Sequence, residues 1–214
     1  MKISENTPTA STTSQVSKQY SGNQRPAVNH QERLAVSKPG ARSVIEKWDN
    51  IPQADFVQRV AGEFVIQHSQ DLCKNKKVVI FSLPGAFTPT CSEKQLPGYE
   101  EMYDRFKQAG VDEVYCVSVN DGFVMNAWAE SLGIKNVKLL ADGNADFTDS
   151  MGMLCTKRAK GFANRSWRYA IYVVNGIVQQ AYIEPGFNHN DEDDDPYTCT
   201  DPETMIQHIE AENR

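Results

Sequence analysis

The residue whose setting could support chemistry is Cys91, in the stretch VVIFSLPGAFTPTCSEKQLPGY at 78–99. The apolar, β-branched run at 78–81 predicts a buried strand. Thr90 and Glu93 then fit a capping box with Thr90 as N-cap, which places Cys91 in the first turn of a helix. Unpaired backbone N–H groups and the helix dipole stabilise negative charge there, and the thiolate is the reactive form of cysteine. The pattern favours a nucleophilic thiol, although a buried, inert cysteine would fit the same place.

The residues around Cys91 resemble a known family. Pro84-x-x-x-Thr88-x-x-Cys91 resembles the active-site motif of the peroxiredoxins. The fuller string PGAFTPTCS, followed by LPGY, is similar to the Prx5-like branch, including bacterial forms fused to glutaredoxin. The resemblance runs from about Pro52 to about Ile209, so it covers most of the chain without its N-terminal part. The long string is highly specific, whereas a bare PxxxTxxC would be weak evidence.

The resemblance implies a thiol-dependent peroxidase that reduces hydrogen peroxide and organic hydroperoxides. Cys91 would attack one peroxide oxygen and become a sulfenic acid. The hydroxyl of Thr88 would face the sulfur or the peroxide, and Pro84 would shield the pocket from water. Backbone N–H groups near Cys91 would hold the peroxide oxygens.

Such a site also needs a fixed cation, and the string NRSWRYA offers Arg165 and Arg168. In Prx5-like proteins the arginine before the aromatic residue at the start of a strand completes the site, and by position this is Arg168. An arginine keeps its charge at any working pH and offers a planar fork of donors. The chain departs from the family at Gln95, where relatives usually have His, which leaves the role of that side chain open.

Two routes could reduce the sulfenic acid. Cys199 stands about where atypical two-cysteine Prx5 proteins keep a resolving cysteine, which implies a Cys91–Cys199 disulfide reduced by thioredoxin. The glutaredoxin-fused relatives resemble this chain more closely around GFANRSWRYA and DPYTCTDPETM, and they typically work without a resolving cysteine. We expect this second route, with glutathione or glutaredoxin as reductant. A disulfide needs its sulfurs about 2.05 Å apart, so the first turn around Cys91 would have to unwind.

The elements that must position these residues follow the order β-α-β-α-β, hairpin, α. This order predicts an α/β sandwich with a central mixed β-sheet flanked by helices, compatible with a thioredoxin-like fold, which the resemblance favours. We predict strands at 55–57, 63–66, 78–81, 114–119 and 138–141, and a hairpin at 167–183 turning at Asn175-Gly176.

Three longer helices are predicted. The first runs from Cys91 to about Ala109, with a kink at Pro97. The second spans 123–132, with Phe123, Ala127 and Trp128 facing inward. The third spans 202–211, capped by Asp201 or Thr200, with Pro202 at its first position. The segment 152–163 is predicted to be an irregular loop.

The first 42 residues differ in composition from the rest of the chain. They are rich in Ser, Thr, Asn and Gln, with few large apolar residues, and so predict a disordered polar tail. The tail lacks the apolar core of a secretory signal. Organelle targeting is the less favoured interpretation, because no Arg-rich amphipathic helix is present. Residues 43–214 are expected to form the thioredoxin-like peroxiredoxin domain.

Composition excludes several classes of function. No apolar stretch approaches the roughly 18 residues that span a membrane, and the net charge of -6 argues against a nucleic-acid partner. Five cysteines without a CxxC pair indicate neither a disulfide framework nor a zinc site, and they suit a reducing compartment. We expect a cytoplasmic protein with no bound cofactor or metal, and with glutathione as co-substrate. A homodimer is expected by analogy alone, since many members of the family are dimers.

Two other functions are compatible with the sequence. A non-catalytic binding module of thioredoxin-like fold would present the tail or the acidic run at 191–195 to a partner. A cysteine hydrolase would need a histidine near Cys91, and nothing in the sequence ties any of the four histidines to it. The acidic run lacks the ligand spacing of a calcium loop, so we expect it to be solvated.

Overall fold

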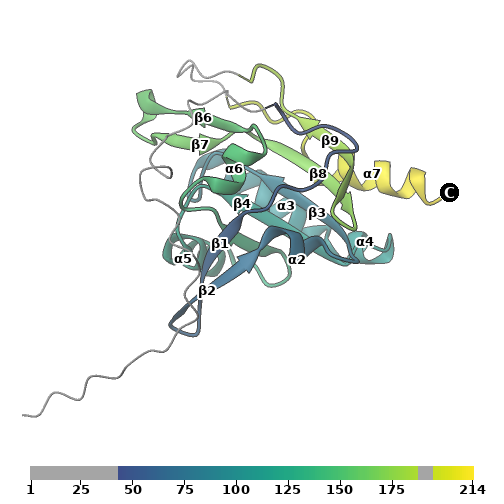
Figure 1. Ribbon diagram of the computed structural model, residues 1–214, viewed down its shortest axis with the longest axis horizontal. Helices are drawn as coiled ribbons and strands as arrows, with labels where there is room; N and C mark the ends of the chain where they lie inside the picture. The colour runs from purple at the N-terminus through teal and green to yellow at the C-terminus, as the bar shows by residue number, and fades with distance from the viewer. Residues whose placement is uncertain (1–42, 188–194) are drawn as a thin grey trace, which may run out of the picture. The chain divides into compact units, whose positions relative to one another are not determined.

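A five-stranded mixed sheet forms the centre of the structure, a computed structural model that describes residues 43–187 and 195–214. The tail predicted at 1–42 therefore lies outside the described residues. The strands are β3 (Lys77–Ser82), β4 (Glu113–Ser118), β5 (Lys138–Ala141), β8 (Tyr169–Val174) and β9 (Ile177–Ile183). Their order is β5-β4-β3-β8-β9; Figure 1 labels β4, β3, β8 and β9. The first three run parallel, whereas β8 and β9 are antiparallel to their neighbours. This confirms the predicted α/β, thioredoxin-like fold.

The two faces of this sheet carry separate apolar cores. Along β3, Val79 and Phe81 face a core closed by four helices, and Val78 and Ile80 face a second core on the other side. Alternate residues of a strand point to opposite faces, which is how the single apolar run at 78–81 serves both cores. The four helices of the first core are α3 (Leu96–Glu101), α4 (Tyr103–Gln108), α5 (Gly122–Leu132) and α7 (Pro202–Glu212). The second core includes residues of α2 (Ser69–Cys73) and α6 (Asp146–Ser150).

Two small hairpins lie outside the central sheet. The first joins β1 (Asp55–Val60) to β2 (Glu63–His68) and confirms the two strands predicted there. The second joins β6 (Leu154–Thr156) to β7 (Asn164–Ser166) through the 3-10 helix η2 (Arg158–Lys160). The prediction of an irregular loop at 152–163 is therefore wrong. Strands of three residues are too short to show an alternating pattern, so only their pairing reveals them.

The turn at Asn175-Gly176 confirms the strongest local prediction. Both residues have positive φ, 47° and 81°, as a two-residue turn between antiparallel strands requires. The turn joins β8 to β9. The antiparallel pairing of β8 with β3 places the start of β8 beside the end of β3, where Ser82 pairs with Tyr169.

The helix that carries Cys91 begins and continues differently from the prediction. Thr90 is already helical, with φ -56° and ψ -38°, and makes no capping bond, so its assignment as N-cap is wrong. The carbonyl of Thr88 accepts the bond from Ser92 N at 2.9 Å, which places Cys91 in the first turn as expected. The expected kink at Pro97 is replaced by a π-helical stretch, η1 (Cys91–Gln95), that ends as α3 begins.

The π turn has a local cause in the proline. Pro97 has no N–H and cannot donate to the carbonyl four residues earlier. The N–H of Leu96 reaches back five residues to the carbonyl of Cys91, a wide turn of the kind found as single π-bulges. The helix thus continues past Pro97, with the wider hydrogen-bond spacing confined to η1.

Helix α5 confirms the predicted burial of Trp128, but the predicted burial of Phe123 and Ala127 is wrong. Phe123 is 59% exposed and Ala127 is exposed, whereas Met125 and Trp128 are buried. Asp121 caps the helix through Phe123 N and Val124 N, so the first helical residue is Gly122. A Cβ at that glycine would lie 2.9 Å from the backbone N of Arg59. The start of α5 therefore packs closely against the backbone of β1.

The last helix, α7, confirms its predicted start. Asp201 accepts a bond from Thr204 N, and Pro202 stands at the first position. Within residues 43–187 and 195–214, no helix is long and apolar enough to span a bilayer.

The orientation of α5 can be tested by paired substitutions. Trp128→Ala removes a fully buried ring that also donates to Ser92 Oγ at 3.0 Å, so we expect a loss of about 3–5 kcal/mol in the free energy of unfolding. Phe123→Ala, on the exposed face, should change it by about 1 kcal/mol or less. Urea unfolding of both variants measures the difference. Equal losses would contradict the observed orientation.

Candidate active site

Cys91 lies fully buried in the first turn of its helix, within the apolar core under the helical face of the sheet. Its Sγ accepts a hydrogen bond from Nη1 of Arg168 at 3.6 Å. The sulfur is therefore shielded from water yet lies against a guanidinium. A thiol without that partner would be an ordinary core residue, whereas a cation beside it favours the thiolate.

The guanidinium of Arg168 is held on every nitrogen. Nη1 also donates to Gln95 Oε1, Nη2 donates to the carboxylate of Asp195, and Nε donates to the carbonyl of Pro196 at 3.0 Å. The ring of Tyr197 lies 5.6 Å from the guanidinium carbon. With a residue exposure of 1%, Arg168 has little freedom to turn away from the sulfur.

Arg168 stays charged in this buried setting. Burial alone would lower the pKa of its guanidinium, but the sulfur of Cys91 and the carboxylate of Asp195 raise that pKa above its ordinary value. A buried charge is tolerated when it is paired and hydrogen-bonded. The site therefore holds a permanent positive charge beside Cys91.

A small cavity of about 130 Å³ opens beside Thr88 and beside Asp195, the carboxylate partner of Arg168. Two predicted site residues, Pro84 and Thr88, line it, although Cys91 is not among its lining residues. The hydroxyl of Thr88 donates to the carbonyl of Gly85 at 2.8 Å, which leaves its oxygen free to accept a bond. The volume suits a few water-sized groups. The full lining is Pro84, Thr88, Pro89, Lys157, Lys160, Phe162 and Asp195.

Arg165, the other candidate cation, has a different place. Its Nη1 donates to the carbonyl of Val119 at 2.8 Å and its Nε to the carbonyl of Phe162 at 3.1 Å. These bonds tie β7 to the end of β4. Of the two arginines, Arg168 is the one that contacts the sulfur of Cys91.

Sequence reasoning missed two residues of this arrangement. Gln95, noted only as a departure from the family, is fully buried one turn after Cys91 and binds Arg168. Its spacing of four residues from Cys91 was an available signal. Asp195 ends the run predicted to be solvated, and its pairing with Arg168 makes that prediction wrong at this position. The rest of the run lies outside the described residues, and no local signal pointed to Asp195.

Cys199 is a free thiol, as are the other four cysteines. Its Sγ donates to the carbonyl of Ile183 at 3.4 Å, and its backbone N donates to Glu184 at 3.0 Å. Burial and then the charge of Glu184 raise the pKa of the Cys199 thiol to about 11. The structure thus brings together Pro84, Thr88, Cys91 and Arg168, and it shows Cys199 engaged with other partners.

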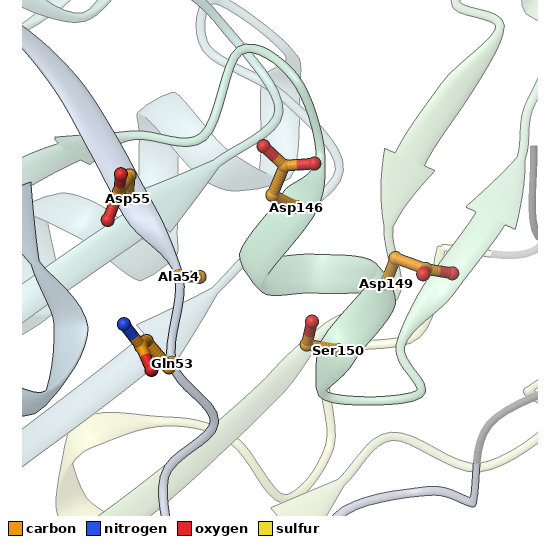
Figure 2. A pocket seen from close by; sticks show the side chains of 6 residues that line it. All are labelled: Gln53, Ala54, Asp55, Asp146, Asp149 and Ser150. Atoms are coloured by element: carbon orange, nitrogen blue, oxygen red, sulfur yellow. The ribbon is translucent and has the colours of Figure 1, made fainter. Parts of the chain in front are cut away.

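A second hollow, shown in Figure 2, has about 410 Å³ and an acidic lining. It lies between the start of β1 and helix α6 and contains none of the predicted site residues. The lining of the hollow consists of Gln53, Ala54, Asp55, Asp146, Asp149 and Ser150. Among the residues that the structure describes, no group of three or more His, Cys, Asp and Glu could hold a metal ion.

Comparison with known proteins decides the family. The model for the Redoxin family matches residues 49–195. The chain is 49% identical over 166 residues to "Peroxiredoxin y4vD" of Sinorhizobium fredii, covering 73% of this chain and 88% of that relative. The chain belongs to the peroxiredoxin family. As a peroxiredoxin it is a peroxidase that reduces hydroperoxides with electrons from a reductant partner.

Further relatives of this peroxiredoxin include a hybrid protein. The chain is 44% identical over 164 residues to "Hybrid peroxiredoxin hyPrx5" of Haemophilus influenzae, covering 77% of this chain and 66% of that relative. Among solved structures, reduced Prx3 of Vibrio vulnificus in complex with hydrogen peroxide matches with a TM-score of 0.70 and 36% identity. That match covers 78% of this chain and 99% of the other.

The alternative function, a cysteine hydrolase, would need a histidine beside Cys91. His68 and His208 instead pair with Asp55 and Glu212.

The arginine of this peroxiredoxin site can be tested by a conservative substitution. Arg168→Lys keeps one charge but cannot reproduce the planar set of donors to Cys91, Gln95, Asp195 and Pro196. We expect the rate of Cys91 oxidation by hydrogen peroxide to fall about 10²-fold or more, measured by stopped flow. Arg165→Lys is the matched control and should stay close to wild type. An unchanged rate in Arg168→Lys would remove Arg168 from the site.

Proposed function

We propose that this peroxiredoxin reduces hydrogen peroxide and organic hydroperoxides through a Cys91 sulfenic acid that glutathione or glutaredoxin then reduces. The observation that carries the proposal is the 3.6 Å contact between Cys91 Sγ and the buried guanidinium of Arg168. The relative from V. vulnificus, crystallised with hydrogen peroxide, supports the substrate class.

The chemistry at the sulfur follows from this pair. The thiolate of Cys91 attacks one peroxide oxygen, an S–O bond forms and the O–O bond breaks. Sulfur is oxidised to sulfenic acid, and the leaving oxygen departs as hydroxide or alkoxide, which takes a proton to give water or alcohol. Arg168 stabilises the thiolate before the step and the leaving oxygen during it, since its donors are fixed in a water-poor site.

Access to the buried sulfur would come from the cavity lined by Pro84 and Thr88. The Thr88 oxygen can accept a bond from the peroxide while its own hydroxyl proton is donated to the carbonyl of Gly85. Pro84 is buried at the wall and offers no N–H of its own. The small volume limits the water that could compete for the sulfenic acid.

Direct reduction by glutathione or glutaredoxin is favoured by the setting of Cys199. A resolving cysteine attacks as thiolate, and the pKa of about 11 leaves Cys199 almost wholly protonated at neutral pH. In the proposed route, one thiol condenses with the sulfenic acid and releases water. A second thiol then breaks the mixed disulfide and restores Cys91. The hybrid relative agrees with this choice by its name alone.

One observation keeps the thioredoxin route as an alternative. Cys199 is partly exposed, whereas Cys73, Cys91, Cys116 and Cys155 are buried. A Cys91–Cys199 disulfide would require the bonds from Cys199 to Glu184 and Ile183 to break. The cytoplasmic location, the homodimer and the absence of a bound cofactor stay predictions.

The peroxidase proposal is tested by replacing the sulfur. Cys91→Ser should abolish peroxide consumption with every reductant, because a hydroxyl cannot form the sulfenic acid. Coupled NADPH consumption and direct peroxide assay measure the loss, and Cys116→Ser is a control in the same core. Retained turnover in Cys91→Ser would refute the proposal.

The reductant is tested by a second cysteine variant. Cys199→Ala should leave turnover driven by glutathione and glutaredoxin intact, since in the direct route Cys199 forms no bond to Cys91. Steady-state rates with each reductant are compared for wild type and variant. Loss of turnover, together with a Cys91–Cys199 disulfide found by mass spectrometry in wild type, would reverse the choice.

A further inference from the structure

Glu184, the residue directly after β9, forms a dense set of hydrogen bonds without being part of the peroxide site. It is 1% exposed. Its carboxylate accepts from the backbone N–H groups of Thr198, Cys199 and Thr200 at 2.9, 3.0 and 2.9 Å. It also accepts from the hydroxyls of Thr198 and Thr200, at 2.7 and 2.8 Å. One buried carboxylate thus fixes three consecutive residues.

The segment that Glu184 fixes continues directly into the partners of Arg168. Residues 195–200, here called the strap, begin with Asp195, Pro196 and Tyr197. These contribute a carboxylate, a carbonyl and a ring to the guanidinium. The three residues that follow are bound by Glu184. The strap therefore has one end on Arg168 and the other on Glu184.

The backbone of Glu184 is also hydrogen-bonded, to the main chain of Arg168 and to Trp167. Glu184 N donates to the carbonyl of Arg168 at 3.1 Å, and the carbonyl of Glu184 accepts from Trp167 Nε1 at 2.8 Å. Glu184 is thus bonded both to the main chain of Arg168 and to the strap that holds the guanidinium. A shift of the strap relative to β8 would change the direction of the Arg168 side chain.

Only an ionised carboxylate suits this place. Burial alone would raise the pKa of Glu184, but the bonds from Cys199, Thr198 and Thr200 outweigh burial and lower that pKa below its ordinary value of 4.5. Buried charges are stable when hydrogen bonds satisfy them. A glutamine would turn an NH₂ group toward a set of donors, so at least one donor would lose its partner.

We propose that Glu184 is a positioning residue for peroxide reduction: it fixes the strap so that Asp195 and Pro196 hold Arg168 against Cys91. The proposal rests on the proposed role of Cys91 as peroxidatic sulfur. We call the hydrogen bonds from the strap to the Glu184 carboxylate the clamp. Without the clamp, Asp195 and Pro196 would shift relative to Arg168. Misplacement of a stabilising group by about 1 Å can cost on the order of 10²-fold in rate.

The test compares two buried carboxylates in the full-length protein. Glu184→Gln removes the clamp, and Asp142→Asn is the matched control. Asp142 is also 1% exposed and accepts from backbone N–H groups of Phe147 and Thr148, away from the strap. Stopped flow gives the rate of Cys91 oxidation by hydrogen peroxide across pH, and urea unfolding gives the stability of each variant.

We expect Glu184→Gln to lower the oxidation rate about 10- to 100-fold at neutral pH. Asp142→Asn should keep the wild-type rate even where it loses as much stability. Equal rates for folded Glu184→Gln and wild type would overturn the proposal, and so would an equal fall in both variants.

A double-variant cycle shows whether the effect passes through the strap. In an Asp195→Asn background, Glu184→Gln should cost clearly less than it does alone, and full additivity would overturn the proposed route. Thr198→Val removes one hydroxyl donor and serves if Glu184→Gln does not fold; it should lower the rate several-fold, and an unchanged rate would overturn the proposal. Retained turnover in Cys91→Ser would refute the peroxidase role itself, whereas failure of Glu184→Gln alone refutes only the positioning role.

Discussion

The interaction on which the structure depends is the contact between a buried sulfur and a buried guanidinium. Arg168 is 1% exposed and Cys91 is fully buried, so neither has bulk water to solvate its charged form. Burying a lone guanidinium is costly, and the cost falls only because the thiol, a glutamine, a carboxylate and a carbonyl surround it. The arrangement that satisfies Arg168 also aims its donors at Cys91.

The sheet delivers the two partners from distant parts of the chain. Strand β3 ends at Ser82 and runs into the segment with Pro84, Thr88 and Cys91. Strand β8 is antiparallel to it, and Tyr169 pairs with Ser82. Arg168, one residue before Tyr169, therefore stands beside the end of β3. The tight turn at Asn175-Gly176 joins β8 to β9, and β9 leads to Glu184, so the sheet places this carboxylate next to Arg168 as well.

The negative and polar groups around Arg168 come from three separate segments. Gln95 comes from the π-helical stretch η1, where Pro97 widens the turn. Asp195 and Pro196 come from the strap, which Glu184 fixes through Thr198 to Thr200. The site therefore depends on one local irregularity of a helix and on one tertiary clamp. Both set the direction of a single side chain.

The sequence by itself determined the strand at 78–81, the helix start near Cys91, the Asn175-Gly176 hairpin and the motif with Pro84 and Thr88. The strand and the hairpin are local properties, since turn chemistry and side-chain alternation act over a few residues. The motif with Pro84 and Thr88 was recognised by its resemblance to the family. Arg168 was found only through the resemblance, because its partner lies 77 residues away. Tertiary structure alone decided the hairpin of β6 and β7, the inward face of α5, and the pairing of Asp195 and Glu184 with their distant partners. Strand pairing and burial bring together segments that are far apart in the sequence, and the local pattern of one segment does not specify its distant partner. These contacts could therefore be seen only in the folded chain.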